Sequence, residues 1–214
     1  MAQCRYCNKR GFFLTVSKYG LCKNCEGPVM ASIESIGRVI YESMKIANES
    51  KNLNTKIKRL DTMIDMSKKL QEEFIDRGIN PLTGDSPQTI IEKAEKAKLE
   101  NIEIELRKKV EFHLEKARRA QTSKTMISNA DKALDELLKF NQEYDYENKE
   151  LELEIHAFIH KANYEGLVLE AEKFEFKDNV KKAIDKYQEA LFFLKRDGIP
   201  DEQQQELISS LETK

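Results

Sequence analysis

The sequence predicts a mainly α-helical fold with a small β-hairpin at the N-terminus, and three observations lead to this fold class. Charged residues make up 35% of the 214 positions, with only eight Gly and four Pro, which is the profile of a helix-rich soluble protein rather than of a β-sandwich or barrel. From about residue 29 onward, apolar residues recur at steps of three and four, as on an amphipathic helix. All four cysteines, by contrast, lie within the first 25 residues.

The cysteines form two CxxC pairs, Cys4 with Cys7 and Cys22 with Cys25, and fourteen residues separate the pairs. In a reducing compartment such pairs are more often metal ligands than disulfides. Two residues between cysteines let both sulfurs face one ion, and two pairs complete a tetrahedron. The spacing therefore predicts one structural Zn²⁺ bound by these four thiolates, with no open coordination position for catalysis.

Two other chemistries of CxxC pairs stay open. A redox-active pair is one, although no thioredoxin-like βαβ pattern surrounds either pair. Rubredoxin-type iron is the other, although rubredoxin knuckles usually have Gly after the second cysteine, where this chain has Asn8 and Glu26. Metal binding also explains how so short a segment folds, because its apolar residues are too few for a core of their own.

Between the pairs we expect a strand over residues 12–16, a turn over 17–20 and a return to Leu21, and Pro28 is placed to open a helix. Knuckle, hairpin, second knuckle and helix in this order resemble a zinc ribbon or treble-clef finger over about the first 35 residues. The resemblance implies a structural zinc. We expect the helical body to stay folded without the metal, because its core is predicted to be separate. The apolar face of the helix after Pro28 comprises Val29, Ile33, Ile36 and Ile40.

The N-terminal segment is basic, since residues 1–26 contain five Lys or Arg and one Glu, a net charge of +4. This charge and the nearby aromatic residues favour nucleic-acid binding as an alternative function, because cations pair with phosphates and aromatic rings stack on bases. The zinc–thiolate group lowers the net charge to about +2, and in the other interpretation the aromatic residues are a miniature core. The candidate nucleic-acid contacts are Arg5, Lys9, Arg10, Lys18 and Lys23, and the aromatic residues are Tyr6, Phe12, Phe13 and Tyr19.

The rest of the chain is predicted as helices with short connections. Ser86 is a plausible cap for one helix, with Pro87 as its first residue, and Thr122 or Ser123 caps the next. We predict a zinc ribbon over 1–28, a helical pair over 29–80, a linker over 81–87, and helical pairs over 88–214. The expected helices are 29–50, 53–77, 87–120, 122–145, 149–176, 180–196 and 201–211, and the seam of the third comprises Leu99, Ile102, Leu106, Val110, Ala117 and Ala120.

Residues 166–196 resemble a tetratricopeptide repeat (TPR), which implies a helical protein-binding scaffold. There are departures: Glu170 stands where that family usually has a large apolar residue, and the proline expected after the second helix comes late, as Pro200. A generic helical bundle, such as the three-helix microtubule-interacting-and-transport type, is the alternative. The matching small and aromatic positions are Ala171 and Phe174 in the first helix and Ala183, Tyr187 and Ala190 in the second.

No catalytic residues are predicted. His156 and His160 have a spacing able to hold one metal ion, but no Glu directly follows the first His, and the apolar residues beside them indicate the boundary of a helix face. The chain has no phosphate-binding loop and no nucleophile with a partner His. We therefore expect no enzyme activity.

Two segments of the chain carry blocks of opposite charge. Residues 107–124 contain seven Lys or Arg and two Glu, while residues 143–154 contain six acidic residues and one Lys. Solvated helix faces explain such blocks, and so does pairing of the blocks with each other or with a partner of opposite charge.

The sequence thus predicts a cytoplasmic, zinc-containing helical protein-interaction or adapter module without catalytic activity; the alternative is a nucleic-acid-binding accessory protein that uses the basic ribbon. A protein partner is expected. No membrane partner is expected, because no apolar run is long enough to span a bilayer and the N-terminus lacks a signal-peptide core. A homo-oligomer stays open, since the seam over 99–120 can pack within one chain or against another copy.

Overall fold

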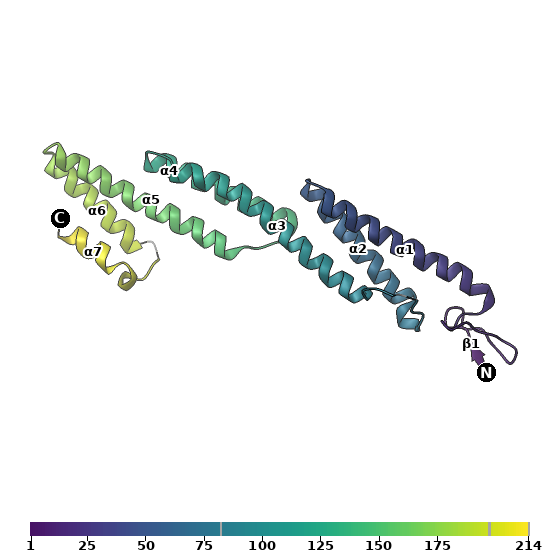
Figure 1. Ribbon diagram of the computed structural model, residues 1–214. Coiled ribbons are helices and arrows are strands. Elements are labelled where there is room, and N and C mark those ends of the chain that lie inside the picture. Colours follow the sequence, from purple (N-terminus) through teal and green to yellow (C-terminus); the bar gives the residue numbers. More distant parts are fainter. Residues whose placement is uncertain (82, 197, 214) are drawn as a thin grey trace. The chain divides into compact units, whose positions relative to one another are not determined.

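The computed structural model describes residues 1–81, 83–196 and 198–213 and confirms a mainly α-helical protein with a small antiparallel hairpin at the N-terminus (Figure 1). The chain forms two compact units, Met1–Glu105 and Leu106–Lys214. The first contains β1 (Ala2–Gln3), β2 (Arg10–Gly11), α1 (Lys23–Glu49), α2 (Leu53–Glu73), the 3₁₀ helix η1 (Ile75–Arg77) and the beginning of α3 (Pro87–Arg118). The second contains the rest of α3, α4 (Ser123–Tyr144), α5 (Lys149–Phe176), α6 (Val180–Arg196), η2 (Asp201–Gln203) and α7 (Gln205–Glu212).

Side-chain caps start two helices where the sequence predicts them. The Ser86 hydroxyl accepts the Thr89 N–H at 3.2 Å, and Pro87 is the first residue of α3. The Thr122 hydroxyl accepts the Thr125 N–H at 3.3 Å at the start of α4. Each cap satisfies an N–H group that the first helical turn cannot satisfy itself, so both helix starts are fixed locally.

The first helix, α1, begins earlier than predicted, at Lys23, so the prediction that Pro28 opens it is wrong. The carbonyl of Cys22 accepts the N–H groups of Cys25 at 2.9 Å and Glu26 at 3.0 Å, which makes the second cysteine pair the first turn of the helix. The expected boundary between ribbon and helical pair at residue 28 therefore falls inside a continuous helix.

The N-terminal hairpin also differs from the prediction, because the chain before Cys4, rather than the chain near Leu21, supplies the partner strand. Residues 12–16 form no regular strand, and only an isolated bridge joins Val16 to Cys22. The hairpin therefore encloses the first cysteine pair. Its opposed residues are Ala2 with Gly11 and Gln3 with Arg10.

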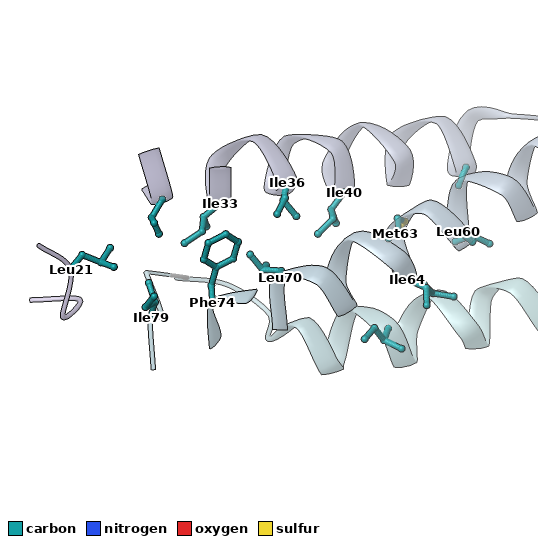
Figure 2. Close-up of a cluster of buried hydrophobic side chains, with 14 of the residues drawn as sticks. Leu21, Ile33, Ile36, Ile40, Leu60, Met63, Ile64, Leu70, Phe74 and Ile79 are labelled. Atoms are coloured by element: carbon teal, nitrogen blue, oxygen red, sulfur yellow. The ribbon is translucent and has the colours of Figure 1, made fainter. Parts of the chain in front are cut away.

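The core of the first unit lies between α1 and α2 and continues into the N-terminal segment (Figure 2). The apolar face predicted for α1 is confirmed as buried. Near the cysteines, Leu21, Phe74 and Ile79 belong to the same buried cluster. The metal-binding segment and the helical pair thus share one core, whose helical members include Val29, Ile33, Ile36 and Ile40 of α1 and Leu60, Met63, Ile64 and Leu70 of α2.

The buried seam of α3 bypasses Leu99, which is 53% exposed, so its predicted place in the seam is wrong. Lys98 lies beside the seam instead, and its ammonium forms an ion pair with Asp61 of α2 at 2.7 Å. A lysine can do this because its aliphatic stem lies along apolar surface while its charge reaches a partner. The buried residues of α3 are Pro87, Ile91, Ala94, Ile102, Leu106, Val110, Leu114 and Ala117, and Ala120 is half-buried just beyond the helix.

In the second unit, α5 and α6 pack along the segment that resembles a TPR. Small residues of both helices are buried in one cluster, which lets the two backbones approach closely, and the rings fill the space beside them. The prediction that five positions share this interface is confirmed. Ala171, Ala183, Tyr187 and Ala190 are buried in the cluster, and Phe174 packs against it.

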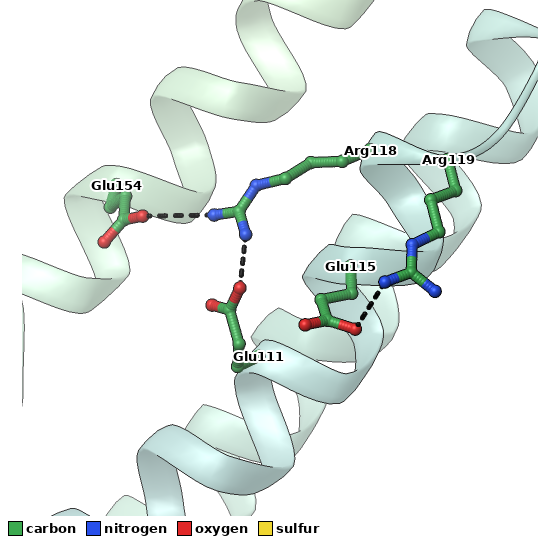
Figure 3. Close-up of polar contacts among 5 residues, drawn as sticks. All are labelled: Glu111, Glu115, Arg118, Arg119 and Glu154. Atoms are coloured by element: carbon green, nitrogen blue, oxygen red, sulfur yellow. Dashed lines mark hydrogen bonds and ion pairs between the residues drawn. The ribbon is translucent and has the colours of Figure 1, made fainter.

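The two opposite charge blocks meet at one point in the second unit (Figure 3). Arg118 of α3 forms an ion pair with Glu154 of α5 at 3.6 Å and another with Glu111 two turns earlier in its own helix. Arg119 pairs only within α3, with Glu115 at 3.3 Å. Arg118 therefore links the two blocks.

We expect Ala183→Leu to lower the free energy of unfolding by roughly 1–3 kcal/mol, because the longer side chain has no room at the buried α5–α6 contact. Ala157→Leu is the matched control, since Ala157 is exposed in the middle of α5 and its substitution should change stability by less than about 0.5 kcal/mol. Urea unfolding followed by circular dichroism measures both. Equal effects of the two substitutions would contradict the interface.

Candidate metal centre

The four cysteines come together at the N-terminus as one group of sulfur ligands. Their Sγ atoms all lie within 4.8 Å of one another, and the Cys7 and Cys22 sulfurs are 3.9 Å apart. In a tetrahedral site with Zn–S bonds of roughly 2.3 Å, two sulfurs are about 3.8 Å apart. The cluster is therefore the right size to hold one metal ion without rearrangement of the backbone.

The hairpin loop positions the first pair. The Cys4 N–H donates to the Lys9 carbonyl at 3.0 Å, and the Asn8 N–H donates to the Cys4 carbonyl at 2.9 Å. Asn8 closes the loop with a left-handed φ of 59°. Asparagine tolerates this conformation better than most residues, so it serves where knuckles usually have glycine.

The second pair uses the start of α1. The Cys22 N–H points at the Cys4 sulfur at 3.4 Å, and Cys25 lies in the first turn of the helix. The N-terminus of a helix carries a partial positive charge, which favours thiolates placed there. Both knuckles thus direct backbone N–H groups or a helix dipole toward the sulfurs.

The thiols differ in their affinity for protons. Burial raises the pKa of Cys4, but N–H groups of Cys22, Cys7 and Tyr6 outweigh burial and hold the pKa at about 6. The pKa of Cys25 is raised to about 12, mainly by a hydrogen bond with the Cys22 thiol and then by burial and the other two thiols. One sulfur is thus ready to ionise, whereas the other keeps its proton because the neighbouring thiols hydrogen-bond to it and it is partly removed from water. A bound cation favours loss of that proton.

The first CxxC loop also holds the end of the helical pair, which no sequence pattern indicated. The Arg5 guanidinium donates to the Gly78 carbonyl, and the Arg5 N–H donates to the Gly20 carbonyl at 2.9 Å. Both glycines have a positive φ, and a Cβ on Gly20 or Gly78 would come within 2.5 Å or 2.9 Å of the Arg5 side chain. Gly78, in the segment just after η1, is thus where Arg5 docks.

Tyr6, the other residue of that loop, makes the second half of this contact. Its ring stacks on Phe74 with centroids 6.2 Å apart and planes 10° apart. Arg77 donates to the Tyr6 carbonyl at 3.3 Å and lies over the Tyr6 ring at 5.7 Å. The two residues between Cys4 and Cys7 therefore clamp the segment after α2, and we call these contacts the knuckle clamp. The clamp and the shared core contradict the prediction of a separate core for the helical body.

The predicted basic contacts are placed unevenly. Arg5 donates to the Gly78 carbonyl in the knuckle clamp while its residue stays exposed, and the four lysine and arginine residues that follow it are exposed as well. The Lys18 ammonium lies 4.9 Å from the centre of the half-buried Tyr19 ring. The exposed set comprises Lys9, Arg10, Lys18 and Lys23.

The interpretation of the aromatic residues as a miniature core is wrong for two of them. Phe12 is 83% exposed and Phe13 is 97% exposed. Leu21 and the two buried cysteines form the local core instead, because the metal ligands occupy the centre that larger side chains would otherwise fill.

The histidines do not form a metal site in the part of the chain that the structure describes. His156 is exposed with its Nε2 4.0 Å from Glu152, and the half-buried His160 ring stacks on Phe193 at 4.8 Å. Among the residues that the structure describes, the four cysteines are the one group of three or more His, Cys, Asp or Glu whose ligand atoms lie close together.

Comparison with protein-family models, with curated proteins and with solved structures finds no match to the chain. Among the helices that the structure describes, none combines the length and the apolar character required to cross a membrane. The geometry of the molecule is therefore the basis for assigning a function.

We expect one zinc ion per chain by elemental analysis, and we expect its chelation to loosen α1 and α2 as well as the ribbon, because they share a core and the knuckle clamp. Hydrogen exchange with and without chelator measures this as lost protection of α1 and α2 amides, restored by added zinc. Amides of α5 and α6, in the other unit, are the internal control. Full protection of α1 and α2 after metal removal would show that the clamp contributes nothing.

We expect Gly78→Ala to destabilise the first unit by about 1–2 kcal/mol, because alanine is strained at a φ of 74° and its Cβ meets Arg5. Gly84→Ala is the control, since no atom lies within 4 Å of the added Cβ. Thermal unfolding of the metal-bound protein compares the two. A change in Gly78→Ala no larger than in Gly84→Ala would argue against the clamp.

Proposed function

We propose that the protein is a non-catalytic interaction protein in which a structural zinc ion holds the N-terminal ribbon and the helices of the second unit bind a protein partner. The observation that carries the proposal is a groove of about 540 Å³ over α4, α5 and α6. A groove on paired helices is a common way to bind a peptide or a helix of another protein.

Zinc is the metal that this donor set favours. Four cysteine sulfurs at tetrahedral spacing select zinc or iron, and they leave no position for water or substrate. A closed site has a structural role, and here the chain uses the site to anchor the knuckle clamp. This use supports a structural assignment over redox chemistry.

The groove has the chemistry of a peptide site. Its lining includes apolar side chains of three helices and charged residues of both signs. Gly166 of α5 approaches α4 so closely that a Cβ there would lie 2.7 Å from the Ser123 Cβ. The apolar members are Ile127, Leu167, Leu169 and Phe193, and the charged members are Lys124, Glu170, Lys173 and Glu189.

Nucleic-acid binding by the basic ribbon, the alternative function, has less support. Arg5 is occupied by the Gly78 carbonyl, and Tyr6 is stacked on Phe74. Two of the groups expected to contact phosphates and bases are thus committed to the knuckle clamp. Protein binding at the groove is therefore the function that the geometry supports best.

We expect a photo-crosslinking amino acid at Leu169, on the wall of the groove, to capture a specific protein from a cell extract of the natural source. The same amino acid at Phe176, which is also exposed on α5 but lies outside the groove lining, is the control. The full chain is used, because truncation at residue 28 would cut α1. Loss of the Leu169 crosslink when Glu170 and Glu189 are replaced by lysine would tie capture to the groove.

Equal capture from both positions, or capture of nothing at Leu169, would contradict the proposal. Mass spectrometry of the crosslinked product identifies the partner and reports any bound RNA or DNA. A nucleic acid found at the ribbon with no protein at the groove would favour the alternative function.

A further inference from the structure

The most exposed apolar feature of the first unit is the turn that carries Phe12 and Phe13. The two side chains are 83% and 97% exposed, with ring centroids 6.4 Å apart and planes at 65°. Adjacent phenylalanines this exposed cost solubility unless another surface covers them. We name residues 11–14 the phenylalanine turn.

The turn is held by ordered structure on both sides. It begins at Gly11, where β2 pairs with β1, and the Leu14 N–H donates to the Gly11 carbonyl at 3.4 Å. Leu14 also packs against the core of the first unit. The chain thus fixes the base of the turn on the metal-bound scaffold and leaves its apex apolar and solvent-exposed.

The sequence on either side of the turn carries only basic charges. Residues 1–25 contain no Asp or Glu, and the exposed Lys9, Arg10 and Lys18 flank the two rings in sequence. The chain as a whole has a net charge of −2, so the segment with the apolar apex has the opposite sign to the rest. Such a segment is attracted to an anionic surface.

The geometry points to an anionic lipid bilayer as the surface that the phenylalanine turn contacts. An apolar apex enters the acyl boundary while lysine and arginine beside it pair with lipid headgroups. A bilayer yields to a convex tip and needs no preformed pocket. This contact needs no membrane-spanning helix, and it departs from the prediction that the protein has no membrane partner.

Single-stranded nucleic acid fits the same residues less well. Successive stacked bases are parallel, whereas the Phe12 and Phe13 rings are 65° apart and cannot stack on two such bases together. One face of the Tyr6 ring is already stacked on Phe74, and the Arg77 guanidinium lies over the ring at 5.7 Å. The hydrocarbon interior of a bilayer does not require the two rings to be parallel.

The expected strength is that of a reversible peripheral contact. Burial of one phenylalanine raises partitioning roughly tenfold to a hundredfold, and each nearby cation adds roughly fivefold on an anionic surface. Removal of both rings should therefore weaken binding at least about a hundredfold. High salt should weaken binding without abolishing the contribution of the rings.

The first experiment is co-sedimentation of the full, zinc-loaded chain with vesicles of phosphatidylcholine alone or with about one-third phosphatidylserine. Binding is expected on the anionic vesicles, and it should be lost in Phe12→Ser/Phe13→Ser. Phe176→Ser, at an equally exposed phenylalanine of the second unit, should bind as the parent does. Arg10→Gln/Lys18→Gln should weaken binding, and Lys45→Gln/Lys51→Gln, at exposed lysines of the first unit, should leave it unchanged.

The second experiment uses the lack of tryptophan in the chain. Phe13→Trp introduces a single fluorophore at the apex, whose emission should shift to the blue and be quenched by brominated lipid when anionic vesicles are added. Phe176→Trp should show neither change. These readouts report insertion directly and do not depend on how much protein sediments.

Absence of vesicle binding, or binding that the Phe12→Ser/Phe13→Ser variant retains, would overturn the inference. So would tight binding of a single-stranded oligonucleotide that depends on Phe12 and Phe13 without a fluorescence shift on vesicles. The inference stands apart from the proposed protein-binding groove, because crosslinking at Leu169 tests residues of the other unit.

Discussion

The closeness of four thiols is the constraint on which the N-terminal part of the first unit depends. Their sulfurs lie within 4.8 Å of one another, and a hydrogen bond with the Cys22 thiol, followed by burial and the other two thiols, raises the pKa of Cys25 to about 12. A divalent cation bound among the sulfurs attracts all four thiolates, so their closeness then favours ionisation. The chain supplies the geometry through a hairpin loop and a helix start, and the ion supplies the free energy that a small apolar core lacks.

The consequence extends beyond the ribbon because Arg5 and Tyr6 lie between two ligands. Their backbone is fixed by the sulfurs on either side, so their side chains meet Gly78 and Phe74 in a fixed orientation. The ribbon therefore acts as a cap on the open end of the α1–α2 pair. Such a cap covers Phe74 and Ile79, which would otherwise face water at that end.

The sequence predicts what is local and misses what depends on the ligands. Apolar spacing and caps such as Ser86 and Thr122 place the helices, because a helix is built from contacts three and four residues apart. The four ligands were likewise predictable from spacing alone. The positions of Phe12 and Phe13 were not, since hydrophobicity predicts burial and cannot show that cysteines occupy the centre of the segment. The prediction placed Leu99 in the buried seam of α3, but Lys98 lies beside the seam instead. The aliphatic stem of a lysine can pack there as a leucine does, so the apolar pattern alone did not distinguish the two positions.

The ligands also differ in their access to solvent, which bears on how long an ion stays bound. Cys4 and Cys22 are buried, whereas Cys7 is exposed. A competing ligand or an oxidant must approach a sulfur to displace the metal, and Cys7 is the sulfur it reaches first. Residence time is thus a kinetic property governed at a single position, separate from the equilibrium affinity of the four ligands together. Because Cys7 directly follows Tyr6, release of that sulfur also frees the ring that rests on Phe74.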